Sequence, residues 1–509
     1  MLIFQSVLVL LVCAVALAGL ARYLNLPYPS FLALGGTALA FLPQAPTFNL
    51  DPSLTLALFV APALLDAAFD TSLRDLKRYW IPVMSLVFIA VGITIVAVAW
   101  LLRYFIPEIP WAAAIAVGAI VAPPDAVAAS AVMRKLRIPH RIGVIIEGES
   151  LLNDATALLV YRLAVSVAMG ATFTGGGVAL LSLAMVASVG VGFALAHILI
   201  RLLSRVTDIP STIVLQFVTT FGVWIFAEEL HLSPIVTLVV YAITAARLAP
   251  EFTPAATRLP SYAVWETVVF VLNVLAFVLI GLQLRPTLET LEASERNQYL
   301  QIAAAVLGIV IVVRIAWVSV YNRAANLKFR LFGAGWWPGN FVPTWKGSVV
   351  VGWAGMRGIV TLATAYALPA GFPYRDLALL CAVFVVVGTL VVQGLTLRPL
   401  ILLLGLKDDG TVEKELLAAR AQLARVAAEI IDADDSDAAQ MLRAEFAMPS
   451  DADLADGSES QLKRRNRLRA RIIAAQRRAL VRMRRTADIG DDVFHRIEED
   501  LDRTEVSVR

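Results

Sequence analysis

Long apolar blocks separated by short polar connections fill the first four fifths of the 509-residue chain. Most blocks approach the roughly 20 residues that an α-helix needs to cross a lipid bilayer. They are too continuous for the alternating strands of a membrane β-barrel. The pattern therefore predicts an all-α polytopic membrane protein with about thirteen transmembrane helices. We place these spans at roughly 3–22, 30–43, 53–69, 81–105, 111–133, 141–166, 178–203, 210–230, 233–248, 262–284, 298–322, 346–369 and 376–405.

Composition supports a membrane protein and separates a polar tail from the rest. Hydrophobic residues make up 59% of the chain and charged residues 16%, and a soluble protein this apolar would expose too much hydrophobic surface to stay monomeric. Charge is concentrated after Lys407. We therefore predict a transmembrane domain over 1–406 and a small helical tail over 407–509. The net charge of +3 averages these two parts and gives no indication of nucleic-acid binding.

The tail shows two helical stretches, Glu413 to Ile431 and Gln461 to Met483, separated by an acidic segment near Asp432 to Asp456. The second stretch is rich in arginine. Its basic side chains could meet anionic lipid head groups, face solvent, or contact the acidic segment, and the sequence leaves these alternatives open.

The distribution of basic residues predicts the orientation. If the N-terminus lies outside, the cytoplasmic connections hold most of the lysines and arginines, as the positive-inside rule requires. The C-terminal tail is then cytoplasmic, which agrees with an odd number of spans. The first apolar stretch lacks a basic start and a cleavage site, so we interpret it as a retained span. We expect a multi-pass protein of the cell inner (plasma) membrane.

Ionisable residues inside the predicted spans are the strongest pointer to function, because a charge in the bilayer is costly unless it is needed. Six such residues stand out: Asp66, Asp125, Glu149, Asp154, Arg314 and Arg357.

The fifth span contains a predicted helix break. Pro123 and Pro124 remove two consecutive backbone donors, so the helix cannot continue and carbonyl groups are freed at membrane depth. Asp125 then falls in the first turn of the second half-helix, where a carboxylate suits the positive end of the helix dipole. The alternative is a simple proline kink with a structural aspartate cap.

The sixth span offers two polar faces. Ser150 and Asp154, four residues apart, share one face and provide oxygen atoms of the kind that hard cations prefer. Glu149 and Asn153 share a second face, and we propose Arg314 as the buried partner of Glu149 because that arginine is too deep to reach the membrane surface. A purely structural hydrogen-bond network is the alternative.

Two further charges are ambiguous when taken alone. Asp66 is a third candidate carboxylate near the bilayer centre, or else an interfacial residue. Arg357 lies in a glycine-spaced stretch that can unwind, where it either takes part in transport or caps freed carbonyls.

Other chemistries lack a signature in the sequence. The histidines show no metal-ligand spacing, the two cysteines lie far apart, and no glycine-rich phosphate loop with a following Lys and Ser/Thr appears. We therefore expect no resident cofactor, no use of ATP and no enzymatic activity, and instead coupling to an ion gradient. A cation channel, a proton-coupled organic solute symporter and a membrane-embedded protease are the alternatives, and the protease would need a nucleophile with its base or a metal motif.

With these residues in place, the chain resembles the monovalent cation:proton antiporters of the NhaP/NHE type over about residues 3 to 405. The resemblance rests on the motifs Leu65-Asp66, Pro123-Pro-Asp125, Gly148-Glu-Ser-Leu-Leu-Asn-Asp154, Arg314 and Gly355-Met-Arg-Gly358. It implies an inverted-repeat fold with crossed broken helices, a homodimer, and exchange of a monovalent cation for a proton. It also implies a role for this transport in pH and sodium homeostasis.

The resemblance also assigns roles to residues. It implies that Asp154 is the main ion- and proton-binding carboxylate, that Ser150, Asp125 and Asp66 complete or flank the site, and that Asn153 orients it. It implies a structural ion pair between Glu149 and Arg314. Asn153, where a related branch has a second aspartate, resembles the electroneutral branch. The family more often has Thr-Asp-Pro where this chain has Pro124-Asp-Ala126, so the choice among Na⁺, Li⁺ and K⁺ stays open.

Overall fold

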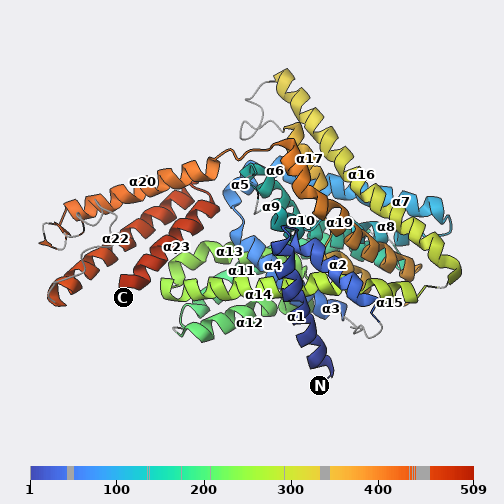
Figure 1. The fold of residues 1–509 in the computed structure, drawn as a ribbon, viewed down its shortest axis with the longest axis horizontal. Coiled ribbons are helices and arrows are strands. Elements are labelled where there is room, and N and C mark those ends of the chain that lie inside the picture. Colours follow the sequence, from blue (N-terminus) through green and yellow to red (C-terminus); the bar gives the residue numbers. More distant parts are fainter. Residues whose placement is uncertain are drawn as a thin grey trace.

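The computed structural model describes residues 2–508 apart from 43–50, 134–135, 137, 173–174, 207, 292, 333–343, 435, 438, 441 and 443–458. Every regular element in these residues is a helix (Figure 1). The all-α membrane architecture is thereby confirmed. In the connection between the fifth and sixth predicted spans, the basic residues Arg134, Lys135 and Arg137 lie outside the described residues.

Ten described helices are long and apolar enough to cross a membrane. They cover Pro52–Asp70, Trp80–Phe105, Trp111–Met133, His140–Ala168, Ala179–Leu203, Ile209–Glu229, Pro234–Phe252, Ala255–Glu289, Glu295–Leu331 and Arg375–Leu404. The predicted number of thirteen is not confirmed. The three other expected spans are also helical, but α1 (Leu2–Tyr23) has a shorter apolar part, α2 (Tyr28–Ala40) has 13 residues, and the third is divided into two short helices.

The remaining membrane helices have the following bounds: α4 (Ala61–Asp70), α7 (Val91–Phe105), α8 (Trp111–Val121), α9 (Ala126–Met133), α10 (His140–Ala168), α11 (Gly175–Leu203), α12 (Ile209–Glu229), α13 (Pro234–Phe252), α14 (Ala255–Leu282), α16 (Ala293–Phe332), α17 (Trp345–Trp353), α18 (Ile359–Tyr366) and α19 (Arg375–Leu404). Several starts follow the same local rule. Asp208 and Ser233 accept hydrogen bonds from backbone amides in the first turns of α12 and α13, and a proline that needs no such partner stands within the first two positions of each helix.

The helices pack in two groups. In the first group, α2 packs on α14, and α13 packs on α4, α11 and α12. In the second, α8 packs on α7 and α10, and α16 packs on α7, α17 and α19. The groups meet where α2 contacts α19 and where α18 contacts α14. Both helix breaks described below belong to the second group, so the candidate site lies beside the boundary between the groups.

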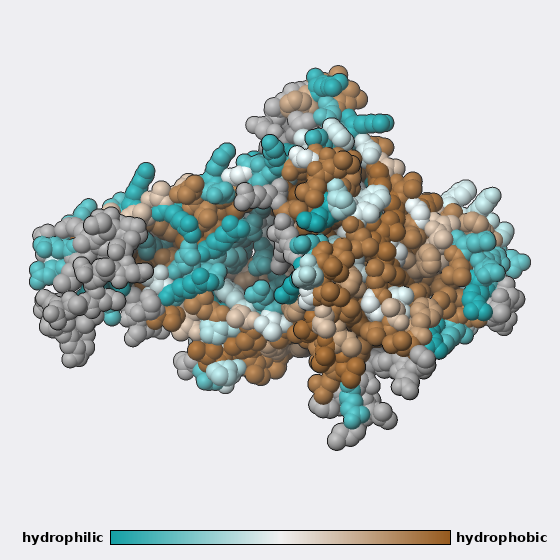
Figure 2. All heavy atoms as spheres, viewed as in Figure 1, coloured by the Kyte–Doolittle hydropathy of each residue, from teal (hydrophilic) through white to brown (hydrophobic). Residues whose placement is uncertain are grey.

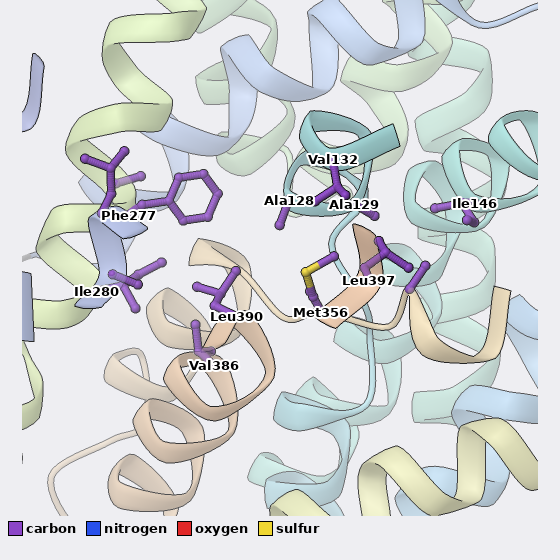
Figure 3. Packing of buried hydrophobic residues seen from close by; sticks show 14 of the residues in the cluster. Ala128, Ala129, Val132, Ile146, Phe277, Ile280, Met356, Val386, Leu390 and Leu397 are labelled. Carbon is purple, nitrogen blue, oxygen red and sulfur yellow. The ribbon is translucent and has the colours of Figure 1, made fainter. Parts of the chain in front are cut away.

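An apolar core fills this boundary. Figure 3 shows Met356 in the middle of buried side chains that include Ala129, Phe277 and Leu390. These residues come from α9, α14 and α19, so both helix groups contribute. Each fully buried Met, Leu or Phe side chain contributes about 1.5–3 kcal/mol relative to exposure. The core therefore holds the interrupted helices in place although their backbone hydrogen bonding is incomplete.

The tail forms a three-helix bundle at one end of the molecule, on the left of Figure 1. It consists of α20 (Thr411–Asp432), α22 (Glu459–Arg485) and α23 (Asp491–Val508), which pack on one another around Leu480 and Phe494. The two predicted helical stretches coincide with α20 and α22, whereas α23 was not predicted. Most of the expected acidic segment lies outside the described residues. Figure 2 shows hydrophilic side chains over the bundle and hydrophobic ones over the membrane helices.

Candidate functional site

Two helix breaks cross at the centre of the second helix group. The first separates α8 from α9 at residues 122–125, and the second separates α17 from α18 at residues 354–358. The amide of Asp125 donates a hydrogen bond to the carbonyl oxygen of Met356 at 2.6 Å, so the breaks touch directly. Pro123 and Pro124 lie in the first break. Because they lack amide hydrogens, the helix cannot continue there, as predicted.

Arg357 ties the second break to the first. Its side chain is buried, with 1% exposed. Its Nε donates to the carbonyl of Val121 at 3.0 Å, and its Nη2 donates to that of Ala122 at 3.1 Å, while Nη1 donates to Gly355. The guanidinium thus satisfies carbonyls that the end of α8 leaves without amide partners.

Asp125 begins the second half of the broken helix. Its Oδ1 accepts a hydrogen bond from the amide of Val127 at 2.9 Å, which caps α9. Its Oδ2 lies against Gly358, and any side-chain carbon at that position would overlap the carboxylate. Glycine at position 358 is therefore required for the carboxylate to lie between the two breaks.

Ser150, Asn153 and Asp154 of α10 face the first break. The Ser150 hydroxyl accepts a hydrogen bond from the amide of Ala126 at 3.0 Å, and Asn153 Nδ2 donates to the carbonyl of Pro124 at 2.8 Å. Asp154 is 6% exposed and makes no hydrogen bond within the described part of the chain. Its carboxylate is therefore free of hydrogen bonds at this crossing and can bind a ligand.

Glu149 points to the opposite side of α10 and meets Arg314 of α16. Both are buried, with 1% and 3% of their surfaces exposed. Arg314 donates to both Glu149 carboxylate oxygens, at 2.5 and 2.7 Å, and also to the Val351 carbonyl at the end of α17. This bidentate pair links α10 to α16 and to the second broken helix.

A cavity of about 980 Å³ reaches the site from one side of the membrane. It is lined by Asp154, Asp125, Ser150 and Asp66 and extends to tail residue Asp492. The connections between α1 and α2 and between α9 and α10 also line it, so it runs from the helix crossing toward the tail. The cavity therefore connects Asp154 with the tail side of the molecule in this conformation.

Asp66 lies in the cavity wall contributed by α4 and is half-buried. Within the described residues, no three His, Cys, Asp or Glu side chains are close enough to hold one metal ion together. The carboxylates of Asp66, Asp125 and Asp154 therefore do not form one three-carboxylate site, and Asp66 flanks the route to the other two. Asn153 is fully buried beside the break and does not line the cavity.

Several polar residues of the cavity were not predicted. Glu147, Glu266, Asn273 and Arg398 line its wall. Asn273 stands alone in the apolar run of α14, a signal that the sequence does contain. In the sequence, Glu266 and Arg398 resemble ordinary charges at the membrane interface. They are distinguished from such charges only by the packing of their helices around a cavity.

The tail borders the mouth of the cavity through charged contacts. His140, the first residue of α10, lies 3.3 Å from Asp75 and 3.4 Å from Asp492 of α23. Burial favours a higher pKa for Asp75, but the His140 contact and the Arg74 charge outweigh it and hold the pKa of that carboxyl below its usual range. Burial raises the pKa of Asp492. Arg74 also contacts Glu415 of α20 at 3.0 Å.

A buried ion pair fixes the tail to the first helix group. Arg258 of α14 donates to both carboxylate oxygens of Asp502, one of them at 2.8 Å through Nε, and it lies 3.5 Å from Glu498. All three side chains are at most 3% exposed. The tail thus contacts α14 in one helix group and the start of α10 in the other.

A family model described as "Sodium/hydrogen exchanger, transmembrane" matches residues 7–403. An uncharacterised Na⁺/H⁺ exchanger of Mycobacterium tuberculosis is 30% identical over 100% of this chain and 97% of its own length. A sodium, potassium, lithium and rubidium/H⁺ antiporter of Bacillus pumilus is 30% identical over 81% of this chain and 63% of its own.

Among solved structures, the sodium/proton antiporter MjNhaP1 of Methanocaldococcus jannaschii has a similar fold. Its TM-score is 0.59 at 17% sequence identity, and the match covers 80% of this chain and 100% of that one. At this identity the likeness concerns the fold.

Proposed function

Because the chain belongs to the sodium/hydrogen exchanger family and is thus a monovalent cation:proton exchange transporter, we propose that Asp154 is the carboxylate at which cation and proton compete. The observation that carries this proposal is the environment of the Asp154 side chain. Asp154 is buried at the helix crossing, lines the cavity, and has no hydrogen-bond partner within the described residues.

Neighbouring oxygen atoms complete the proposed cation site. Asp125 has one carboxylate oxygen engaged by Val127, which leaves the other for a ligand, and the Ser150 hydroxyl keeps a lone pair after accepting from Ala126. Hard monovalent cations prefer such oxygen ligands. Asn153 positions the break through Pro124, and Asp66 lies on the route to the site.

Exchange follows from mutual exclusion at this site. A buried, ionised and empty carboxylate is costly by several kcal/mol, and either a proton or a cation removes that cost. The two loaded forms carry similar net charge, whereas the empty form carries an uncompensated negative charge. Reorientation is therefore allowed with either ion bound and is suppressed when the site is empty, which couples the two fluxes.

The supporting charge pairs have other roles. Glu149 and Arg314 compensate each other away from the cavity, so they stabilise the fold around the site. Arg357 holds the two breaks together through carbonyl groups at the end of α8. Neither arginine needs to bind the transported cation.

We further infer the stoichiometry of the exchange, the orientation of the chain and its oligomeric state. A single titrating carboxylate supports electroneutral exchange of one cation for one proton, with Na⁺ as the main cation and Li⁺ or K⁺ as further substrates. The positive-inside rule supports an outside N-terminus and a cytoplasmic tail in the plasma membrane. The resemblance to NhaP-type antiporters supports a homodimer surrounded by membrane lipid, with a function in pH and sodium homeostasis.

The test is transport by purified protein in liposomes with an imposed pH gradient. Addition of Na⁺, Li⁺ or K⁺ to the wild type should dissipate the gradient, and the variant Asp154→Asn should not respond to any of them. Glu499→Gln, which changes an exposed carboxylate of the tail, is the matched control and should transport normally. Wild-type exchange by Asp154→Asn would overturn the assignment.

A further inference from the structure

A second cavity, of about 820 Å³, lies between the tail and the membrane domain. Its walls come from α22, from Pro250 and Glu251 in the last turn of α13, and from Glu505 of α23. It shares no lining residue with the cavity that leads to Asp154. Its volume is within the range of about 300–1,000 Å³ that is usual for small-molecule sites.

The walls of this second cavity are strongly basic. Five arginines line it, against two acidic residues: Arg467, Arg477, Arg478, Arg482 and Arg485, with Glu251 and Glu505. Arg485 pairs with Glu251, and Arg477 contacts Glu505 at 2.6 Å. The remaining three, Arg467, Arg478 and Arg482, have no acidic partner among the described residues.

One arginine combines burial with an unused donor. The Nη1 atom of Arg477 is buried and makes no hydrogen bond in the described part of the chain, although its Nη2 contacts Asp502 at 2.8 Å and Glu505. A buried charged donor without a partner costs more than a satisfied one. An anionic ligand in the cavity would supply the missing acceptor.

Helix geometry explains why these residues share one side of α22. Arg467, Arg478, Arg482 and Arg485 are separated by 11, 4 and 3 residues, and at about 100° per residue they lie within roughly 60° of one another. Residues such as Leu468, Leu480 and Met483 are buried against the rest of the tail bundle. The basic face of α22 is therefore the face that is directed toward the membrane domain.

The cavity also has an apolar part and lies at a defined level relative to the membrane. Ile473, Val481 and Pro250 contribute aliphatic surface between the arginines. Because α13 is a candidate span that ends at Phe252, Pro250 and Glu251 mark the membrane surface on the tail side. A ligand here must therefore combine negative charge with apolar groups and must be present at the level of the lipid head groups.

We propose that this cavity binds the head group of an anionic phospholipid. Its phosphate would accept hydrogen bonds from Arg478, Arg482 and Arg477 Nη1, and the start of its acyl chains would lie on the aliphatic surface. Guanidinium groups suit phosphate because they present several donors in one plane. The bound lipid joins α22 to the end of α13 and so attaches the tail to the membrane domain independently of the Arg258 pair.

The experiment measures lipid binding to the full-length protein by native mass spectrometry, with phosphatidylglycerol and phosphatidylcholine of identical acyl chains as probes. The wild type should retain phosphatidylglycerol preferentially. Arg478→Gln/Arg482→Gln should weaken that binding about 30-fold, which corresponds to about 2 kcal/mol for two arginines. Arg478→Lys/Arg482→Lys keeps the charge but not the planar donors, so it should lose less of the binding than Arg478→Gln/Arg482→Gln, which separates loss of charge from misfolding.

Two controls make the outcome decisive. Arg420→Gln/Arg425→Gln removes two charges from α20, outside the cavity lining, and should bind phosphatidylglycerol like the wild type. Asp154→Asn should also bind it normally, because the lipid site is independent of the proposed ion site. Equal phosphatidylglycerol binding by wild type and Arg478→Gln/Arg482→Gln would overturn the proposal. It would also be overturned if ATP, rather than the lipid, bound in an Arg478- and Arg482-dependent way.

Discussion

Removal of Arg314 should destabilise the membrane domain far more than removal of an arginine from a surface ion pair. Arg314 and Glu149 form a bidentate pair at 2.5 and 2.7 Å, and their side chains are 4% and 1% exposed. In Arg314→Met the carboxylate of Glu149 loses its ion-pair partner while remaining buried. The Val351 carbonyl at the end of α17 loses its hydrogen bonds as well.

The expected size of this effect follows from burial. Breaking a buried pair from one side costs about 3–5 kcal/mol, because an uncompensated charge stays in a low-dielectric interior. The entropy of unfolding of roughly 2.1 cal/mol/K per residue amounts to about 0.8 kcal/mol/K for a domain of roughly 400 residues. The apparent melting temperature should therefore fall by about 4–6 °C.

The assay is thermal unfolding of purified protein in one detergent at neutral pH, with two comparison variants. Arg503→Met breaks an exposed pair with Glu499, in which the side chains are 68% and 45% exposed, and should cost less than about 1 kcal/mol. Glu149→Met/Arg314→Met removes both buried charges and should recover most of the lost stability. A melting temperature of Arg314→Met equal to that of Arg503→Met would refute the reasoning.

Two further predictions concern the site and the tail. Ser150→Ala removes a hydroxyl oxygen from the proposed cation site and the acceptor for the Ala126 amide, so the apparent KM for Na⁺ in the liposome assay should rise about tenfold; an unchanged KM would exclude Ser150 as a ligand. Arg258→Leu removes the arginine of α14 from the buried carboxylates Asp502 and Glu498 and leaves Asp502 paired with Arg477 of the tail, so the tail loses this link to α14 and trypsin should cleave it faster than in the wild type. Arg420→Leu, which breaks an exposed pair with Asp500, should have little effect. Equal cleavage of both variants would contradict the anchoring role of Arg258.

The membrane fold could be predicted because apolar runs of this length have few other stable solutions. The break at Pro123 and Pro124 was predictable for a similarly local reason, since prolines lack the amide that a helix needs. The contact between Glu149 and Arg314 followed from the cost of burying either charge alone. Each of these inferences depends on a single span or on a strong energetic penalty.

Contacts between distant segments were not predictable where no buried charge requires a partner. Asp125 and Met356 are joined by a hydrogen bond between backbone atoms, which carry no sequence signature. Arg357 donates hydrogen bonds to the carbonyls of Val121 and Ala122. The sequence alone could not distinguish this contact with a distant helix from a cap on carbonyls of its own segment. Helix α23 is strongly charged, and its contacts with Arg258 of α14 and Arg477 of α22 show why Asp502 and Glu498 tolerate burial.

The central claim, that a cation and a proton exclude each other at Asp154, is tested most directly by proton release on cation binding. Purified wild-type protein in weakly buffered detergent solution should release close to one proton for each Na⁺ that it binds, and Asp154→Asn should release none. Na⁺ binding without proton release by the wild type, or equal release by Asp154→Asn, would contradict the account.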